Sequence, residues 1–142
     1  MSRRTPIVAS IVATAIALAG GHPAQASPCR AYTVDRPETP YGYEEINTCP
    51  LLSGDFANAD WRVSIMPWEP AAYLYRGVDR HTGASIQLID FDVVGTTERP
   101  QYRFHNGDTT YVVSFQYADP DTIRLQVFHL GQPLLNQLLS RE

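Results

Sequence analysis

QYRFHNGDTTYVVSFQY, residues 101–117, reads as two β-strands joined by the turn Asn106-Gly107. Asn-Gly is a strong hairpin signal, because both residues tolerate the positive φ angles that a two-residue turn requires. This turn would pair His105 with Asp108. Side chains alternate along a strand, so one face of the hairpin is expected to be apolar and aromatic. That face comprises Tyr102, Phe104, Tyr111, Val113, Phe115 and Tyr117.

Further short segments alternate in the same way and are separated by turn sequences rich in Pro, Gly and Asp. They are residues 61–65, 72–78, 85–94 and 122–129. A lone hairpin is marginally stable in water, so these segments are expected to pack with it. About six to eight short strands and no long helix predict an all-β fold, either a small antiparallel β-sandwich or a barrel built from hairpins.

Two segments are ambiguous. In residues 85–94, the apolar positions change phase between Leu88 and Ile89, and a β-bulge would explain the change. In residues 134–139, leucines four apart suit a helical turn, whereas the position after a turn suits a strand. We favour the strand.

Residues 1–26 have the features of a secretory signal peptide. Arg3 and Arg4 precede an uncharged apolar stretch, and the sequence Ala-Gln-Ala ends at Ala26. The apolar stretch is shorter than the roughly 20 residues that span a membrane, so cleavage is favoured over a retained anchor. Ser2-Arg3-Arg4 resembles the start of a twin-arginine signal, but Pro6 stands where that motif has a bulky apolar residue, so general secretory export is favoured. Cleavage would leave residues 27–142 as a single β domain without a stable membrane span.

Cys29 and Cys49 are the two cysteines of the chain, and both follow the predicted cleavage site. An even number of cysteines in an exported protein indicates a disulfide, which would contribute about 3 kcal/mol through loop closure. Residues 27–60 are rich in proline and glycine. Apart from a short edge strand over residues 29–34, we therefore expect an irregular N-terminal part that this disulfide pins to the domain.

The composition excludes several classes of function. The chain has a net charge of −4 and contains no lysine, which argues against binding nucleic acid or an anionic membrane. His81, His105 and His129 form no metal-binding motif, and no phosphate-binding loop or nucleophile elbow occurs. We therefore expect no metal, no cofactor and no catalytic residue of a known motif.

Asp90 and Asp92 form the one pattern that suggests an enzyme. On a strand, residues two apart project from the same face with Cα atoms about 6.6 Å apart. This spacing is close to that of the two carboxylates of inverting glycosidases, so a small hydrolase is an alternative. A solvated strand face shows the same pattern and is favoured, because Ile89, Phe91 and Val93 would occupy the buried face.

Aromatic residues support two interpretations. Six of them fall on predicted inward faces: Trp61, Tyr73, Tyr75, Tyr102, Tyr111 and Tyr117. They would form either a ligand site or an aromatic core, and the core is favoured.

A candidate binding surface lies on the predicted outer face of residues 122–129. If Ile123, Leu125 and Val127 point inward, Arg124, Gln126 and Phe128 point outward. An aromatic ring beside arginine is typical of an interface hot spot. The alternative is that the C-terminal segment, through Leu135 or Leu138, covers Phe128.

The stretches TGASIQL, YRFHNGDTTYVVS, DPDTIRLQVF and GQPLLNQLLSR resemble the C-terminal core of small exported β-rich proteins of cyanobacteria. The resemblance covers about residues 73–141. The resemblance implies a location in the cell envelope or thylakoid lumen, and the matching stretches contain no catalytic motif.

Together, these observations predict an exported, non-enzymatic binding or structural protein of the cell envelope. Its location would be the periplasm, the thylakoid lumen or the extracellular space, and its partner an envelope protein or a cell-wall component. An inhibitor of a cell-wall-degrading enzyme is a second possibility within binding, because such inhibitors are also small exported β proteins.

Overall fold

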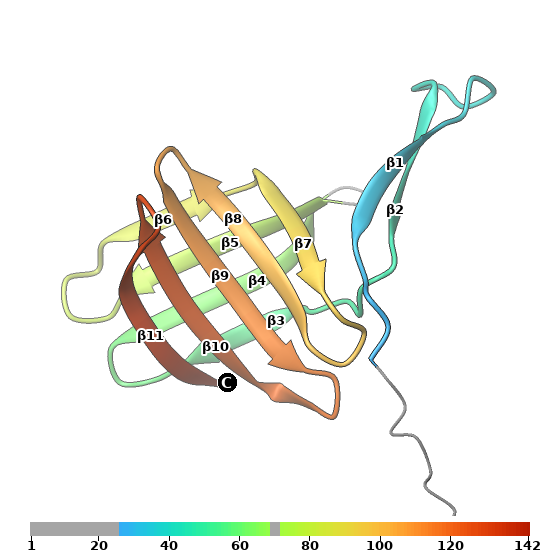
Figure 1. Ribbon diagram of the computed structural model, residues 1–142. Helices are drawn as coiled ribbons and strands as arrows, with labels where there is room; N and C mark the ends of the chain where they lie inside the picture. The colour runs from blue at the N-terminus through green and yellow to red at the C-terminus, as the bar shows by residue number, and fades with distance from the viewer. Residues whose placement is uncertain (1–25, 69–71) are drawn as a thin grey trace, which may run out of the picture.

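The computed structural model describes residues 26–68 and 72–142, which form eleven β-strands and no helix (Figure 1). The strands are β1 Ala31–Asp35, β2 Tyr43–Asn47, β3 Gly54–Ala57, β4 Trp61–Trp68, β5 Ala72–Asp79, β6 Ser85–Leu88, β7 Phe91–Gly95, β8 Pro100–Asn106, β9 Thr109–Gln116, β10 Asp119–His129 and β11 Gln132–Arg141. The predicted all-β antiparallel fold is confirmed, and residues 134–139 are a strand. The predicted signal peptide lies almost entirely outside the described residues. Nothing in the described part of the chain is a helix suited to crossing a membrane.

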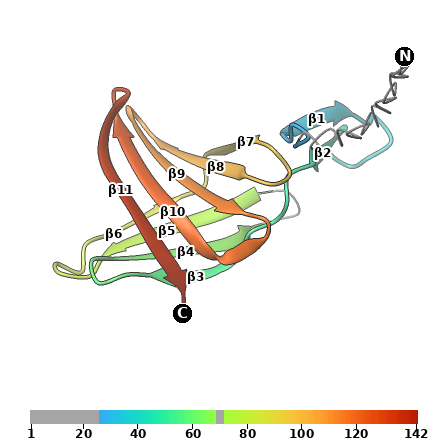
Figure 2. The ribbon, with the colours of Figure 1, turned by 60° about the horizontal axis from the view of Figure 1, so that its bottom comes forward.

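Nine strands form one sheet in the order β6-β5-β4-β3-β11-β10-β9-β8-β7. Except for β3 and β11, neighbours in the sheet are also consecutive in the chain. The sheet curls into a nearly closed, barrel-like shape (Figure 1). Figure 2 shows its two halves, β3–β6 and β7–β11, meeting near the C-terminal end of β11 and separating toward the β10–β11 turn.

The two edges of this sheet, β6 and β7, are joined directly through Ile89 and Asp90. β6 pairs with β5, and β7 pairs with β8. The Asp90 carbonyl accepts a hydrogen bond from the His105 N–H at 2.8 Å, which extends the β7–β8 ladder. The phase change in the sequence is therefore a break at which one segment exchanges partners, rather than the expected β-bulge.

The core lies between the two halves and is rich in aromatic rings. Tyr75 packs against Phe104 and Tyr111, with ring centroids 5.1 and 5.5 Å apart. The ring centroids of Tyr73 and Tyr102 are 5.0 Å apart. The inward positions expected for residues 61–65 and 122–129 are confirmed, since Val63, Ile65, Ile123, Leu125 and Val127 are buried.

The central hairpin differs from its predicted register by two residues. Asn106 pairs with Thr109, so the two-residue loop is Gly107-Asp108 rather than Asn106-Gly107. Gly107 has a φ of 57°, which suits the type II′ class with glycine at the first central position. A register shift of two residues leaves each side chain on the same face of its strand, so Tyr102 and Phe104 still point inward. Tyr117 was predicted inward but is 67% exposed, because β9 ends at Gln116.

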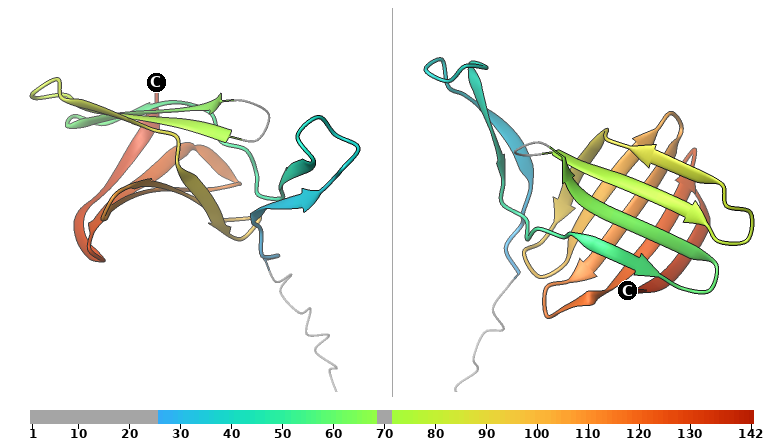
Figure 3. Two further views of the ribbon diagram at one scale, coloured as in Figure 1. Left: turned by 90° about the horizontal axis from the view of Figure 1, so that it is seen from above. Right: turned by 180° about the vertical axis from the view of Figure 1, so that it is seen from behind.

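The N-terminal part is more regular than the sequence suggested. β1 overlaps the edge strand expected over residues 29–34 and pairs with β2 in a separate antiparallel hairpin. β3 belongs to the main sheet, so the expectation of irregular structure is wrong over β2 and β3. The predicted disulfide joins Cys29 to Cys49 at the base of this hairpin, and both residues are buried. Figure 3 shows the β1–β2 hairpin projecting beside one end of the sheet.

This hairpin and its disulfide lie at the end of the sheet where β7 ends. The Cys29 N–H donates to the Gly95 carbonyl at 3.0 Å, and Pro28 forms a bridge with Thr96. The Tyr102 hydroxyl donates to the Pro50 carbonyl at 2.8 Å. The segment after β2 therefore covers this end of the core.

Arg141 joins β11 to β3, the pair of sheet neighbours farthest apart in sequence. Its guanidinium lies 4.7 Å from the ring centre of Phe56. It donates hydrogen bonds to the Asp121 carboxylate at 2.7 Å and to the Ser53 carbonyl at 2.9 Å. Arg141 thus holds together three segments where the two halves of the sheet meet.

Candidate functional site

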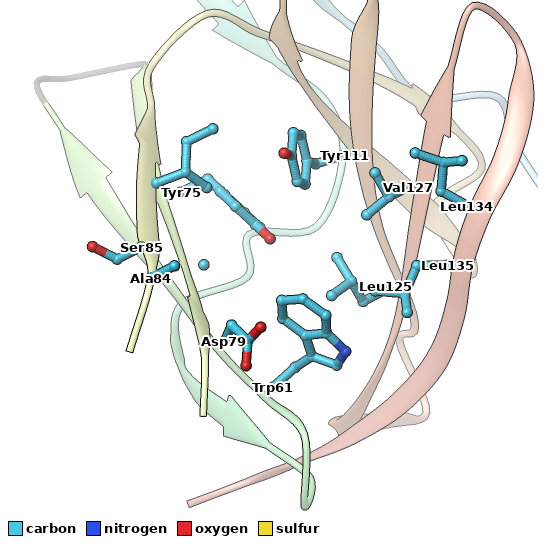
Figure 4. Close-up of a pocket in the computed structure, with 12 residues that line it drawn as sticks. Trp61, Tyr75, Asp79, Ala84, Ser85, Tyr111, Leu125, Val127, Leu134 and Leu135 are labelled. Carbon is cyan, nitrogen blue, oxygen red and sulfur yellow. The ribbon is translucent and has the colours of Figure 1, made fainter. Parts of the chain in front are cut away.

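A cavity of about 400 Å³ opens between the two halves of the sheet, at the end away from the disulfide. Its size is that of pockets that hold small molecules. It is lined by Trp61, Tyr75, Gly77, Asp79, Ala84, Ser85, Ile86, Tyr111, Leu125, Val127, Leu134 and Leu135 (Figure 4). The lining is mostly apolar, and one half comes from β4–β6 while the other comes from β9–β11.

Strand alternation along β5 builds the first wall. Tyr75, Gly77 and Asp79 are two residues apart, so their side-chain positions share the inward face. The Tyr75 ring lies over Gly77, where the missing side chain leaves room for it. Glycine is unfavourable within a strand but marks places where another group approaches the backbone closely. Here that group is the phenol that extends into the cavity (Figure 4).

The Tyr75 hydroxyl is the notable polar group of this wall. Tyr75 is only 1% exposed, and its hydroxyl makes no hydrogen bond to a described residue. Every fully enclosed polar side-chain atom in the described residues has a partner, so this hydroxyl must reach the open cavity. Burial, reinforced by nearby Tyr111, raises the pKa of Tyr75, so the hydroxyl stays protonated and can donate or accept a hydrogen bond.

An irregularity in the β10–β11 pairing builds the second wall. Val127 pairs with Leu135 and Phe128 with Pro133, so Leu134 is an extra residue on β11. In a regular strand, Leu134 and Leu135 would face opposite sides of the sheet. The bulge instead places both at the cavity, which agrees with the way bulges redirect side chains.

Asp79 is the one charged residue among those lining the cavity. It ends β5, and its Oδ1 accepts hydrogen bonds from the backbone N–H groups of His81 at 2.8 Å and Thr82 at 3.2 Å. The His81 hydrogen bond is the main cause that lowers the pKa of Asp79, with further contributions from Thr82. The carboxylate is therefore ionised at neutral pH and held by the turn that follows β5.

The predicted binding residues lie on the other side of the sheet from this cavity. Arg124 and Gln126 line a separate hollow of about 340 Å³ on the outer face. Arg124 donates to the Asn136 side chain at 2.6 Å. Phe128 is half-buried and pairs with Pro133. The structure thus places Arg124 and Gln126 together, while their role in binding stays a prediction.

Asp90 and Asp92 do not form the expected pair on one strand. β7 begins at Phe91, so Asp90 lies in the break between β6 and β7. Asp92 is engaged by Arg103 and by His105, whose Nε2 lies 3.0 Å from the carboxylate. Burial would raise the pKa of Asp92, but the hydrogen bonds from Arg103 and His105 outweigh it and lower the pKa. Asp92 is thus held as an ion-pair partner on the outer face.

Possible metal ligands are dispersed. His81 contacts Asp60 at 2.7 Å in one pair of turns, and His129 contacts Thr109 at 3.0 Å elsewhere. Within residues 26–68 and 72–142, no three histidine, cysteine or acidic side chains converge in a way that would hold a metal ion.

The sequence interpretation noted that Trp61, Tyr75 and Tyr111 face inward, but it assigned them to the core. The cavity itself was missed, and Gly77 within a strand was the available signal of a close approach. No protein-family model matches the chain, and comparisons with curated proteins and with solved structures gave no significant match.

Proposed function

We propose that this protein is an exported, non-enzymatic binding protein that holds a small, mostly apolar molecule in the cavity between the two halves of its sheet. The observation that carries this proposal is the Tyr75 hydroxyl, which has no hydrogen-bond partner among the described residues and faces an apolar, open cavity. Binding sites for small molecules combine an apolar lining with a few polar groups that orient the ligand.

The disulfide at the opposite end supports an oxidising, exported location. Together with the signal-like residues 1–26 and the resemblance to exported cyanobacterial proteins, it favours the periplasm, the thylakoid lumen or the extracellular space. The outer face of β10, with Arg124, Gln126 and Phe128, would remain available for an envelope partner while the cavity is occupied, because it lies on the other side of the sheet. A hydrolase is less well supported, since Asp92 is engaged by Arg103 and His105.

The proposal can be tested with the uncharged fluorescent probe N-phenyl-1-naphthylamine. Trp61 lines the cavity, whereas Trp68 is 50% exposed and lies outside it. A bound probe should accept energy from Trp61. Trp61→Phe should therefore remove most of the energy transfer to the probe. Trp68→Phe is the matched control and should leave the energy transfer unchanged.

A second pair of variants tests the place of binding without relying on fluorescence transfer. Leu135→Trp fills the cavity from β11 and should weaken probe binding at least tenfold, about 1.4 kcal/mol. Leu138→Trp, on the same strand but outside the cavity lining, should not. Failure of the wild-type protein to bind the probe, or equal binding by both variants, would refute the proposed function.

A further inference from the structure

The charge of the cavity restricts the ligand that would bind there. This inference rests on the proposed function and deepens it. Asp79 is ionised and is the one charged residue among the described residues that line the cavity. An anionic ligand such as a fatty acid would meet a negative charge there and no lining cation.

The cations closest to Asp79 in sequence have other partners. Arg80 donates through Nη1 to the Asn58 carbonyl at 2.6 Å, and the His81 ring contacts Asp60 at 2.7 Å. Within the described residues, Asp79 makes no salt bridge. Its charge is therefore balanced by backbone N–H groups, the Thr82 hydroxyl, the nearby His81 ring and solvent, with no direct ion pair that a ligand would have to displace.

The two carboxylate oxygens of Asp79 have different surroundings. Oδ1 accepts the backbone hydrogen bonds of the turn from His81 and Thr82. Oδ2 accepts none from the described residues. Asp79 is paired with Trp61 across the β4–β5 ladder, and Figure 4 shows both side chains at the lower part of the cavity. The turn thus fixes Oδ1 through backbone N–H groups, and the Thr82 hydroxyl adds to the lowered pKa of the carboxylate. Oδ2 makes no such backbone hydrogen bond within the described residues.

A carboxylate beside an aromatic ring is a favourable environment for an organic cation. An ammonium group can pair with the carboxylate and also interact with the face of the indole, which is the best cation–π partner among side chains. The apolar residues above it, Leu125, Leu135 and Tyr111, would contact a hydrocarbon body. We propose that the cavity binds an amphiphilic amine, with its ammonium group between Asp79 and Trp61 and its apolar part among the leucines.

Three ligands with the same twelve-carbon chain separate charge from chain length: dodecylamine, dodecanol and dodecanoate. Each competes with N-phenyl-1-naphthylamine at neutral pH, below its micelle concentration. We expect dodecylamine to bind about tenfold more tightly than dodecanoate, with dodecanol between them. Tenfold corresponds to about 1.4 kcal/mol, which is in the range of a cation–π contact with a partly exposed ion pair.

Asp79→Asn tests the residue directly, because the amide oxygen can still accept the turn hydrogen bonds. The variant should bind dodecylamine about tenfold more weakly and dodecanol unchanged. Asp108→Asn makes the same charge change in the β8–β9 turn, outside the cavity lining, and should alter neither.

The comparison among ligands in the wild-type protein does not depend on how the variant folds. If dodecanoate binds as tightly as dodecylamine, or if Asp79→Asn leaves dodecylamine binding unchanged, the amine proposal is overturned while the cavity remains a binding site. If neither the naphthylamine probe nor any of the three ligands binds, the proposed function fails as well.

Discussion

Gly77 lies directly beneath the phenol of Tyr75, so that a Cβ atom on Gly77 would be 2.7 Å from the Tyr75 hydroxyl oxygen. That distance is well inside van der Waals contact. The Tyr75 ring is itself packed against Phe104 and Tyr111, so it cannot move without disturbing the core. The position of the hydroxyl in the cavity therefore depends on the absence of a side chain two residues along the same strand.

Gly77→Ala should displace Tyr75 and both destabilise the fold and weaken probe binding. Overpacking of this kind costs about 1–3 kcal/mol, measurable by urea unfolding. Adding Tyr75→Phe removes the closest clashing atom but keeps ring carbons 3.0 and 3.1 Å from the new Cβ, so it should restore only part of the stability and none of the polar contact. If Gly77→Ala alone matches the wild-type protein in stability and binding, the close contact does not exist in solution.

Leu130 should lower the stability of the folded protein, so replacing it should increase the free energy of unfolding. It has a φ of 49°, in the left-handed region, and is 67% exposed in the turn between β10 and β11. Asparagine tolerates this conformation better than leucine, so Leu130→Asn should raise the free energy of unfolding by about 1 kcal/mol. Leu138→Asn, at another exposed position without positive φ, should not do so. A lower midpoint for Leu130→Asn in urea would contradict the assignment.

Asp92 should contribute to stability in a pH-dependent way. Its pKa is lowered in the folded protein, so its contribution is complete above the unfolded value and is lost as pH falls through the lower, folded value. The melting temperature of wild-type protein should therefore fall more steeply than that of Asp92→Asn below the ordinary aspartate pKa of 3.8. Asp90→Asn, an exposed carboxylate two residues away, should retain the wild-type slope. Identical slopes for all three proteins would show that the pairs with Arg103 and His105 do not persist in solution.

The disulfide and the cavity should be separable, because they lie at opposite ends of the sheet. Loss of the Cys29–Cys49 bond removes a constraint over a separation of 20 residues, worth about 3 kcal/mol. Reduction should lower the melting temperature, yet probe affinity measured well below it should stay within about twofold of the oxidised protein. The Cys29→Ser/Cys49→Ser variant should behave in the same way. A tenfold loss of affinity in either form would show that the two ends are coupled.

Local pattern was sufficient for most strands from β4 onward and for most of their faces, but not for β2 and β3. Alternation assigned Val63, Ile65, Ile123 and Leu125 to the interior, and an error of two residues in the central turn left every face unchanged. The same pattern failed at strand ends, where it says little about where pairing stops. Tyr117 and Asp90 were both misplaced for this reason.

The cavity depends on relationships that alternation does not contain. It requires β11 to pair with β3 and the two halves of the sheet to separate, which are properties of the whole nine-stranded sheet. It also requires the extra residue Leu134, which breaks the alternation of β11. Asp79 accepts turn hydrogen bonds as an ordinary turn-forming residue does, and nothing in its local sequence indicates that it also lines a cavity with Trp61 and Tyr75.

The contact between β11 and β3 also has a consequence for folding kinetics. The other neighbouring strands of the main sheet follow one another in the chain, so they can associate early by local search. Arg141 and Ser53, in contrast, are 88 residues apart in sequence, and bringing them together requires most of the chain to be ordered already. We expect this contact to form after the rate-limiting step. Arg141→Gln should then accelerate unfolding in stopped-flow denaturant experiments while leaving the refolding rate nearly unchanged.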